Sequence, residues 1–161
     1  MAYNPLHKLK ENIRAISLAI GYTNGLPLSD TDVAELRNYS GFGGIPAILY
    51  PYGTTDEWKG RGATAADLKL HADMMWLHEL LKESFGDTEY KQIIASLRNS
   101  VLSAFYTPKV VPQTLYKVLA DRGIQPRRLY EPSAGSGVFI DEAVKAFPAL
   151  QQITAVEKDR I

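Results

Sequence analysis

Apolar residues in the first part of the chain recur every three or four positions, and this spacing predicts amphipathic helices. The first helix is expected over about 4–20. Its apolar face would be formed by Leu6, Leu9, Ile13, Ile16 and Ile20. A second, shorter helix is expected to begin at Ser29, because Asp32 three residues later is typical of a capping box.

A long helix is predicted from Thr64 to Phe85, and its broad apolar stripe indicates burial on more than one side. Gly86 should end this helix, and another helix should follow it. Between the early and the late helices, residues 40–62 are rich in glycine and proline, which disfavours regular structure. We therefore expect a loop there, of a length that usually has a function or is ordered by a partner. For the glycine-rich part around Phe42, an architectural role is favoured over a catalytic one.

The pattern changes in the last third of the chain. Thr107 and Pro108 predict a helix start, because threonine caps a helix and proline at the first helical position loses no hydrogen bond. The apolar face of this helix would consist of Val111, Leu115, Val118 and Leu119. A strand is expected at 128–131, a helix at 138–147 and a second strand at 153–157. This order predicts a βαβ unit with parallel strands.

The composition is that of an ordinary globular protein and narrows the possible functions. The 161 residues are 45% apolar and 22% charged, and 18 basic side chains balance 18 acidic ones. Because phosphate neutralisation dominates most DNA affinity, zero net charge predicts weak or no DNA binding by this chain alone. The absence of cysteine excludes disulfides and cysteine-ligated metals, and we predict no metal site. No stretch suggests a signal peptide or a membrane span, so we expect a cytoplasmic protein.

The segment from Glu131 to Gly137 has the features of a ligand-binding turn. It follows a predicted strand, opens a predicted helix and contains glycines that let a ligand approach the backbone. Glu157 lies twenty residues after Gly137, at the end of the next strand, where a carboxylate can accept hydrogen bonds from both ribose hydroxyls. The pattern fits a dinucleotide, as in an oxidoreductase, or S-adenosylmethionine. Ile140 stands where the dinucleotide fingerprint has its third glycine, which favours S-adenosylmethionine.

Three short motifs resemble those of S-adenosylmethionine-dependent methyltransferases that modify the amino group of adenine in DNA. Residues 131–139, Glu-Pro-Ser-Ala-Gly-Ser-Gly-Val-Phe, resemble the first cofactor motif, and residues 156–159, Val-Glu-Lys-Asp, resemble the second. Residues 105–108, Phe-Tyr-Thr-Pro, resemble the motif that closes over the methionine end of the cofactor. Upstream, residues 36–45 are similar to a glycine-rich signature of large methylase–helicase proteins of phages and conjugative elements.

The resemblance implies a role for each matching residue. Glu131 would lie toward the methionine ammonium and Glu157 would hold the ribose. Lys158 would flank the adenine ring, where relatives more often have an apolar residue. The methionine side would be lined by Tyr106, Thr107 and Pro108. The other cofactor-binding candidates, most of them in the turn beneath the cofactor, are Pro132, Ser133, Ala134, Gly135, Gly137 and Phe139.

Together these inferences predict an α/β protein that is mostly helical. Residues 1–104 would form a helical region, and 105–161 the start (βαβ) of a Rossmann-like methyltransferase domain. The family's catalytic motif, Asn-Pro-Pro-Tyr or Asp-Pro-Pro-Tyr, does not occur in the sequence, so no catalytic residue is assigned. We expect a fragment of a DNA methyltransferase that is inactive by itself; the alternative is a non-catalytic module that binds a cofactor or a partner. Self-association through an exposed strand edge is a further expectation.

Overall fold

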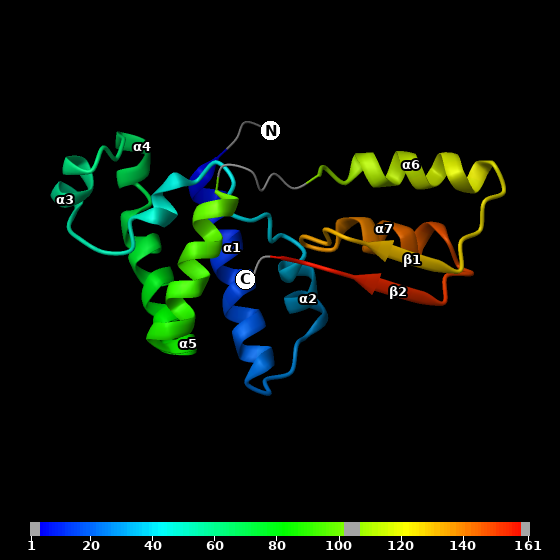
Figure 1. Ribbon diagram of the computed structural model, residues 1–161, viewed down its shortest axis with the longest axis horizontal. Coiled ribbons are helices and arrows are strands. Elements are labelled where there is room, and N and C mark those ends of the chain that lie inside the picture. Colours follow the sequence, from blue (N-terminus) through cyan, green and yellow to red (C-terminus); the bar gives the residue numbers. More distant parts are fainter. Residues whose placement is uncertain (1–3, 102–106, 159–161) are drawn as a thin grey trace. The chain divides into compact units, whose positions relative to one another are not determined.

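The computed structural model describes residues 4–101 and 107–158 of the chain (Figure 1). The chain divides into two compact units, residues 1–105 and residues 106–160. The described residues are mostly helical, with one small parallel sheet in the second unit. The helices of the first unit are α1 (Pro5–Thr23), α2 (Asp30–Leu36), the 3-10 helix η1 (Pro46–Leu49), α3 (Thr55–Gly60), α4 (Ala65–Leu68) and α5 (His71–Ser100).

Side-chain caps begin most of these helices. The Asn4 side chain accepts hydrogen bonds from the second and third amides of α1, and Pro5 occupies the first helical position. The capping box predicted at Ser29 is present, and Thr64 forms another with Asp67. A third box begins at Thr54, whose amide donates to the Glu57 carboxylate at 2.6 Å. The long helix predicted from Thr64 to Phe85 is interrupted, because α4 ends at Leu68 and α5 begins at His71.

The prediction of a continuous loop over 40–62 is wrong in part, because η1 and α3 lie within it. The Thr54 capping box supplies the start of α3, and burial of Trp58 holds this short helix in place. The Trp58 side chain is fully buried, and its ring contacts those of Tyr50 and His71. Tertiary packing thus outweighs the local effect of the neighbouring glycines.

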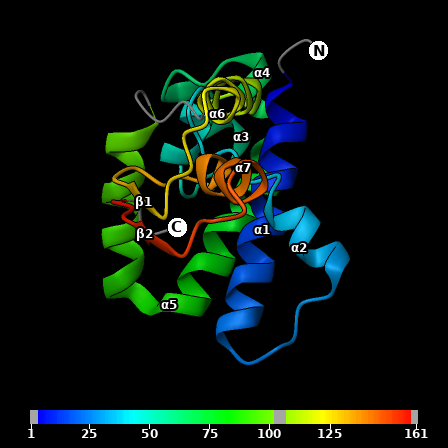
Figure 2. The same ribbon diagram turned by 90° about the vertical axis from the view of Figure 1, so that its right-hand side faces the viewer.

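The predicted break at Gly86 occurs as a sharp bend inside α5. Gly86 has φ 71° and ψ 170°, a combination that essentially only glycine adopts. The bend brings the second half of α5 back against the first, so that Tyr90 contacts His78. Figures 1 and 2 show α5 in these two segments, with α1 beside it.

Gly86→Ala should lower the free energy of unfolding by about 1–3 kcal/mol, because an alanine is strained at this φ and ψ whatever space surrounds it. Urea unfolding followed by tryptophan fluorescence measures the change, since both tryptophans, Trp58 and Trp76, lie in the first unit. Gly60→Ala is the matched control, because Gly60 is helical and a Cβ there meets no atom within 4 Å. Equal losses in both variants would show that the bend tolerates alanine.

The glycine-rich segment 40–46 is part of the core of the first unit. Phe42 and Ile45 are each 1% exposed and pack with the apolar faces of α1 and α5. Asn12 of α1 binds the segment through two hydrogen bonds, accepting from the Ser40 amide at 2.9 Å and donating to the Gly41 carbonyl at 2.7 Å. These contacts make the segment part of the packed interior of the first unit.

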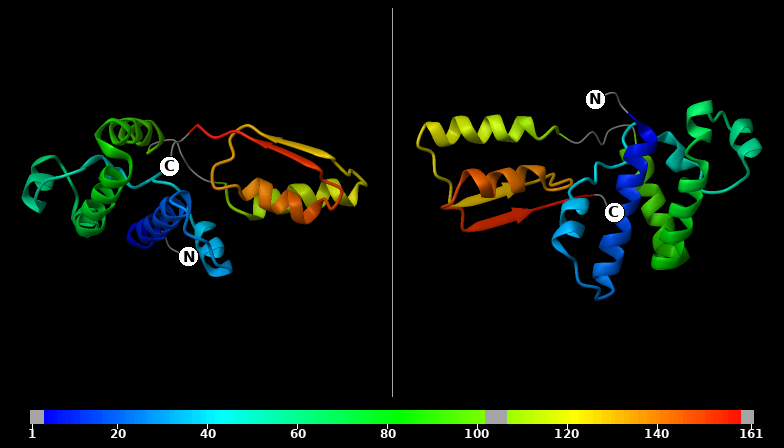
Figure 3. Two further views of the ribbon diagram at one scale, coloured as in Figure 1. Left: turned by 90° about the horizontal axis from the view of Figure 1, so that it is seen from below. Right: turned by 180° about the vertical axis from the view of Figure 1, so that it is seen from behind.

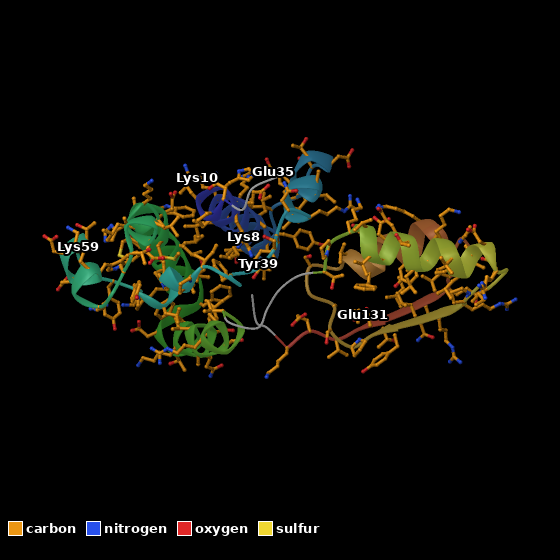
Figure 4. All side chains as sticks on the ribbon, turned by 90° about the horizontal axis from the view of Figure 1, so that it is seen from above. Lys8, Lys10, Glu35, Tyr39, Lys59 and Glu131 are labelled. Carbon is orange, nitrogen blue, oxygen red and sulfur yellow. The ribbon has the colours of Figure 1, made fainter. Side chains whose placement is uncertain are left out.

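Lys8 also binds the glycine-rich segment from α1. Its Nζ donates to the Gly43 carbonyl at 2.9 Å. Burial lowers the pKa of the Lys8 ammonium. Figure 4 labels Lys8 together with Tyr39, whose ring meets that of Phe42 edge-on. The segment is therefore held by polar contacts to its backbone and by apolar contacts to its side chains.

The second unit contains α6 (Val110–Asp121), β1 (Arg128–Glu131), α7 (Val138–Ala146) and β2 (Gln152–Ala155). The strands β1 and β2 are parallel, with Arg128 opposite Gln152 and Glu131 opposite Ala155. This confirms the predicted strand–helix–strand order and the parallel pairing. Both α6 and α7 lie on the same side of the strands (Figure 3, left). Tyr130 of β1 is exposed, as are all four residues of β2.

A small aromatic core joins α6 to α7. The Tyr116 ring meets those of Phe139 and Phe147 edge-on, with centroid distances of 6.2 and 5.3 Å.

Glu142 of α7 accepts a hydrogen bond from Lys145 at 2.7 Å and lies 3.3 Å from Lys109, which precedes α6. The bond from Lys145 lowers the pKa of the Glu142 carboxyl.

Two predictions for α6 are wrong. The helix begins at Val110 and not at Pro108, and its N-cap residue, Lys109, makes no side-chain capping bond. The predicted apolar face is largely exposed: Val111, Leu115 and Val118 are each close to half exposed, whereas Pro112 and Tyr116 are buried. The reason is that α6 turns the Tyr116 ring toward the aromatic residues of α7, and this contact decides which face packs.

Candidate cofactor site

The turn between β1 and α7 is joined by its backbone to the residues that follow β2. The Val156 amide donates to the Glu131 carbonyl at 2.9 Å, which extends the pairing of the two strands. The Ala134 amide then donates to the Val156 carbonyl, also at 2.9 Å. The two segments that resemble cofactor motifs therefore meet at the carboxyl end of the parallel sheet, where α/β proteins commonly bind ligands.

Glu157 contacts the glycine turn directly. Its Oε2 atom accepts a hydrogen bond from the Gly135 amide at 2.5 Å, and its Oε1 atom accepts one from the Lys158 amide at 2.7 Å. Glu131 behaves similarly on the other side of the turn, where its Oε1 atom accepts from the Ser133 amide at 3.0 Å. Two carboxylates from two strand ends thus flank one turn. Figure 4 shows Glu131 at the end of β1.

Two glycines give the turn its shape. Gly135 has φ 52° and Gly137 has φ 79°, and both values lie in the left-handed region that favours glycine. The Gly137 amide donates to the Ala134 carbonyl at 2.8 Å, and the Gly137 carbonyl accepts from the Asp141 amide at 2.9 Å as α7 begins. The amides of Ser133, Ala134, Gly135 and Gly137 are therefore all engaged by acceptors within the unit.

Acidic residues lie before, within reach of and after the turn along the chain, and Lys158 next to Glu157 is a cation. Asp141 lies in the first turn of α7, the helix that follows the turn. Sequence reasoning missed Asp141, although an acidic residue in the first turn of a helix that follows a glycine turn is a visible signal. Carboxylates here favour cations and hydroxyl donors and oppose a second anion such as a pyrophosphate.

The remaining predicted residues are placed as follows. Tyr106 lies outside the described residues. Thr107 is half-buried and Pro108 is exposed, in the segment that leads into α6. Pro132 is exposed at the start of the turn. Phe139 is half-buried and packs edge-on against Tyr116, so its ring belongs to the small core of the second unit.

No protein-family model, curated protein or solved structure matches this chain. Among the residues that the structure describes, no group of three or more histidine, aspartate or glutamate side chains is arranged to hold a metal ion. Within the same residues, no helix combines the length and the apolar character that crossing a membrane requires.

Proposed function

We propose that the second unit, residues 106–160, binds S-adenosylmethionine and that the protein is related to methyltransferases acting on the amino group of adenine in DNA. The observation that carries the proposal is the contact between the Glu157 carboxylate and the Gly135 amide. It joins the two motifs on which the resemblance rests. The ribose hydroxyls of the cofactor would share this carboxylate with the backbone donors or displace them.

The electrostatics of the turn support S-adenosylmethionine over a dinucleotide. S-adenosylmethionine carries a sulfonium and an ammonium group, which the carboxylates of Glu131, Asp141 and Glu157 would attract. A dinucleotide would place its pyrophosphate at a turn whose amides already have acceptors and which Glu157 makes negative. In this proposal Glu131 faces the methionine ammonium and Glu157 holds the ribose.

Isothermal titration calorimetry with S-adenosylmethionine tests the site. The chain should bind the cofactor, and Glu157→Gln should weaken binding about tenfold or more, since hydrogen bonds to a charged group contribute about 1.5–3 kcal/mol. Gly135→Val should also weaken binding, because a β-branched side chain is strained at φ 52° and would fill the space beneath the cofactor.

Matched controls in the second unit distinguish the loss of a contact with the cofactor from a general loss of folding. Asp121→Asn removes an exposed carboxylate from α6, and Gly123→Val imposes a branched side chain on a glycine with φ 75°. Both controls should bind as the unchanged chain does. Binding that survives Glu157→Gln and Gly135→Val would exclude this site, and a preference for NAD would favour an oxidoreductase.

A further inference from the structure

A groove in the first unit collects positive charge around two tyrosines. It runs along α5 on both sides of the bend at Gly86 and has a volume of about 380 Å³. Its lining includes Tyr52 and Tyr90, the cations Lys82, Lys91 and Arg98, and the single carboxylate of Asp87. We call it the tyrosine groove. The lining carries more positive than negative side chains, whereas the chain as a whole has a net charge of zero.

The two tyrosines differ in their surroundings: Tyr52 is largely exposed, whereas the Tyr90 side chain is hydrogen-bonded. The Tyr52 side chain is 66% exposed, while its carbonyl accepts hydrogen bonds from the side chains of Trp58 and Arg61, each at 3.3 Å. The hydroxyl of Tyr90 lies 2.9 Å from the buried His78 ring. An exposed aromatic ring is suited to stack on a flat group such as a base.

The cations are arranged around these rings. Lys91 and Arg98 are seven residues apart on α5, so they lie two turns apart on one face of the helix. The Arg61 guanidinium lies over the Tyr52 ring, 5.8 Å from its centroid. Asp87 is 3.4 Å from Lys82 and offsets that charge. The groove therefore combines an exposed aromatic ring, on which a base could stack, with two cationic side chains along one face of the helix.

We propose that the tyrosine groove binds single-stranded nucleic acid, with one unpaired base on the Tyr52 ring and the neighbouring phosphates beside Lys91 and Arg98. Proteins that bind single strands without sequence preference combine a positive groove with aromatic stacking. A duplex would keep its bases stacked on one another and leave the Tyr52 ring unused. Because the groove lies in the first unit, the proposal is independent of cofactor binding by the second.

Fluorescence anisotropy with a labelled single-stranded oligothymidylate tests the proposal on the full chain. Tyr52→Ala should weaken binding about tenfold, which is the size expected for the loss of one base–aromatic stack. Tyr22→Ala is the matched control, because Tyr22 is a similarly exposed tyrosine at 62% and lies on α1, away from the groove lining. Its affinity should be unchanged.

A second pair of variants tests the positive track. Replacing Lys91 and Arg98 by alanine should reduce the slope of log affinity against log salt by about 1.4, since each single-strand phosphate contact contributes about 0.7. Replacing Lys10 and Lys69 by alanine removes the same charge from exposed positions outside the lining and should leave the slope unchanged. Figure 4 labels Lys10, which lies on α1.

Competition identifies the class of ligand. Unlabelled oligothymidylate should displace the probe better than a duplex, and far better than polyglutamate. Several results would overturn the proposal: no binding of the probe at low salt, equal weakening by the two double variants, or unchanged affinity in Tyr52→Ala. Equal displacement by polyglutamate would likewise overturn it and would indicate a docking groove for an acidic peptide.

Discussion

Replacing Asn12 by alanine should destabilise the first unit by roughly 2–5 kcal/mol, because buried backbone groups left without a partner cost about 1–3 kcal/mol each. Asn12 is fully buried, and its side chain satisfies both the Ser40 amide and the Gly41 carbonyl. Alanine offers neither a donor nor an acceptor at this position. Urea unfolding monitored by tryptophan fluorescence should show the loss as a lower transition midpoint.

A second variant at the same position distinguishes the effect of lost hydrogen bonds from the effect of lost side-chain volume. Asn12→Asp keeps the acceptor for Ser40 but turns a carboxylate oxygen toward the Gly41 carbonyl, which also only accepts. It should be strongly destabilised at neutral pH and recover part of its stability in acid, where a protonated carboxyl can donate. Asn38→Ala removes an exposed asparagine from the same region and should stay near the unchanged chain. Equal stability of Asn12→Ala and Asn38→Ala would show that the Asn12 hydrogen bonds do not stabilise the glycine-rich segment.

The stability of the first unit should fall by about 3 kcal/mol as the pH decreases from about 6.5 to about 4, through His78 alone. Its side chain is 3% exposed. The Ile48 carbonyl can only accept, so His78 Nε2 carries the proton and donates to it at 2.9 Å, while Nδ1 accepts from the Tyr90 hydroxyl at 2.9 Å. These bonds fit the neutral ring, and burial lowers its pKa from 6.5 to about 4.

The direction of this effect follows from proton binding. Between pH 6.5 and pH 4 the unfolded chain binds a proton at His78 that the folded chain does not, so acid favours unfolding. The contribution is complete above pH 6.5 and is lost as the pH falls toward 4. Equilibrium unfolding at several pH values measures it, with tryptophan fluorescence as the probe of the first unit.

His78→Gln removes this titration. The variant should be less stable than the unchanged chain at pH 7, and the difference should shrink toward pH 4. His7→Gln, which alters an exposed ring paired with Glu11 on α1, should keep the original pH dependence. The carboxyls of Asp32, Asp56 and Glu57, whose pKa values are lowered by hydrogen bonds, titrate in all three proteins and cancel in the comparison. Identical pH profiles for His78→Gln and the unchanged chain would contradict the neutral buried ring.

Features that depend on a few neighbouring residues could be predicted from the sequence. Ser29 with Asp32, and Thr64 with Asp67, form capping boxes because donor and acceptor are three residues apart. The bend at Gly86 follows from a backbone conformation that other residues disfavour. In the candidate cofactor site, the predicted parallel pairing of the two strands places Glu157 near the glycine turn, because parallel strands joined by a helix bring their carboxyl ends together; the hydrogen bond from the Gly135 amide to Glu157 was not predicted.

Features that depend on distant residues were decided by the tertiary structure. The amide of Asn12 bonds a carbonyl 29 positions away, and His78 bonds one 30 positions away. No local pattern specifies such pairs, because any buried polar side chain can be satisfied by many backbone groups. The same holds for the tyrosine groove, which combines a ring before α3 with cations from both halves of α5.

The sequence by itself determined the capping boxes at Ser29 and Thr64, the bend at Gly86 and the residues of the glycine turn, since these depend on hydrogen bonds and dihedral angles over a few residues. Only the tertiary structure decided which face of α6 is buried. Leu115 and Val118 predicted one face, and the Tyr116 ring, packed on Phe147, selected another. Periodicity reports that a helix has apolar positions, whereas the face that packs depends on the shape and area of the surface it meets.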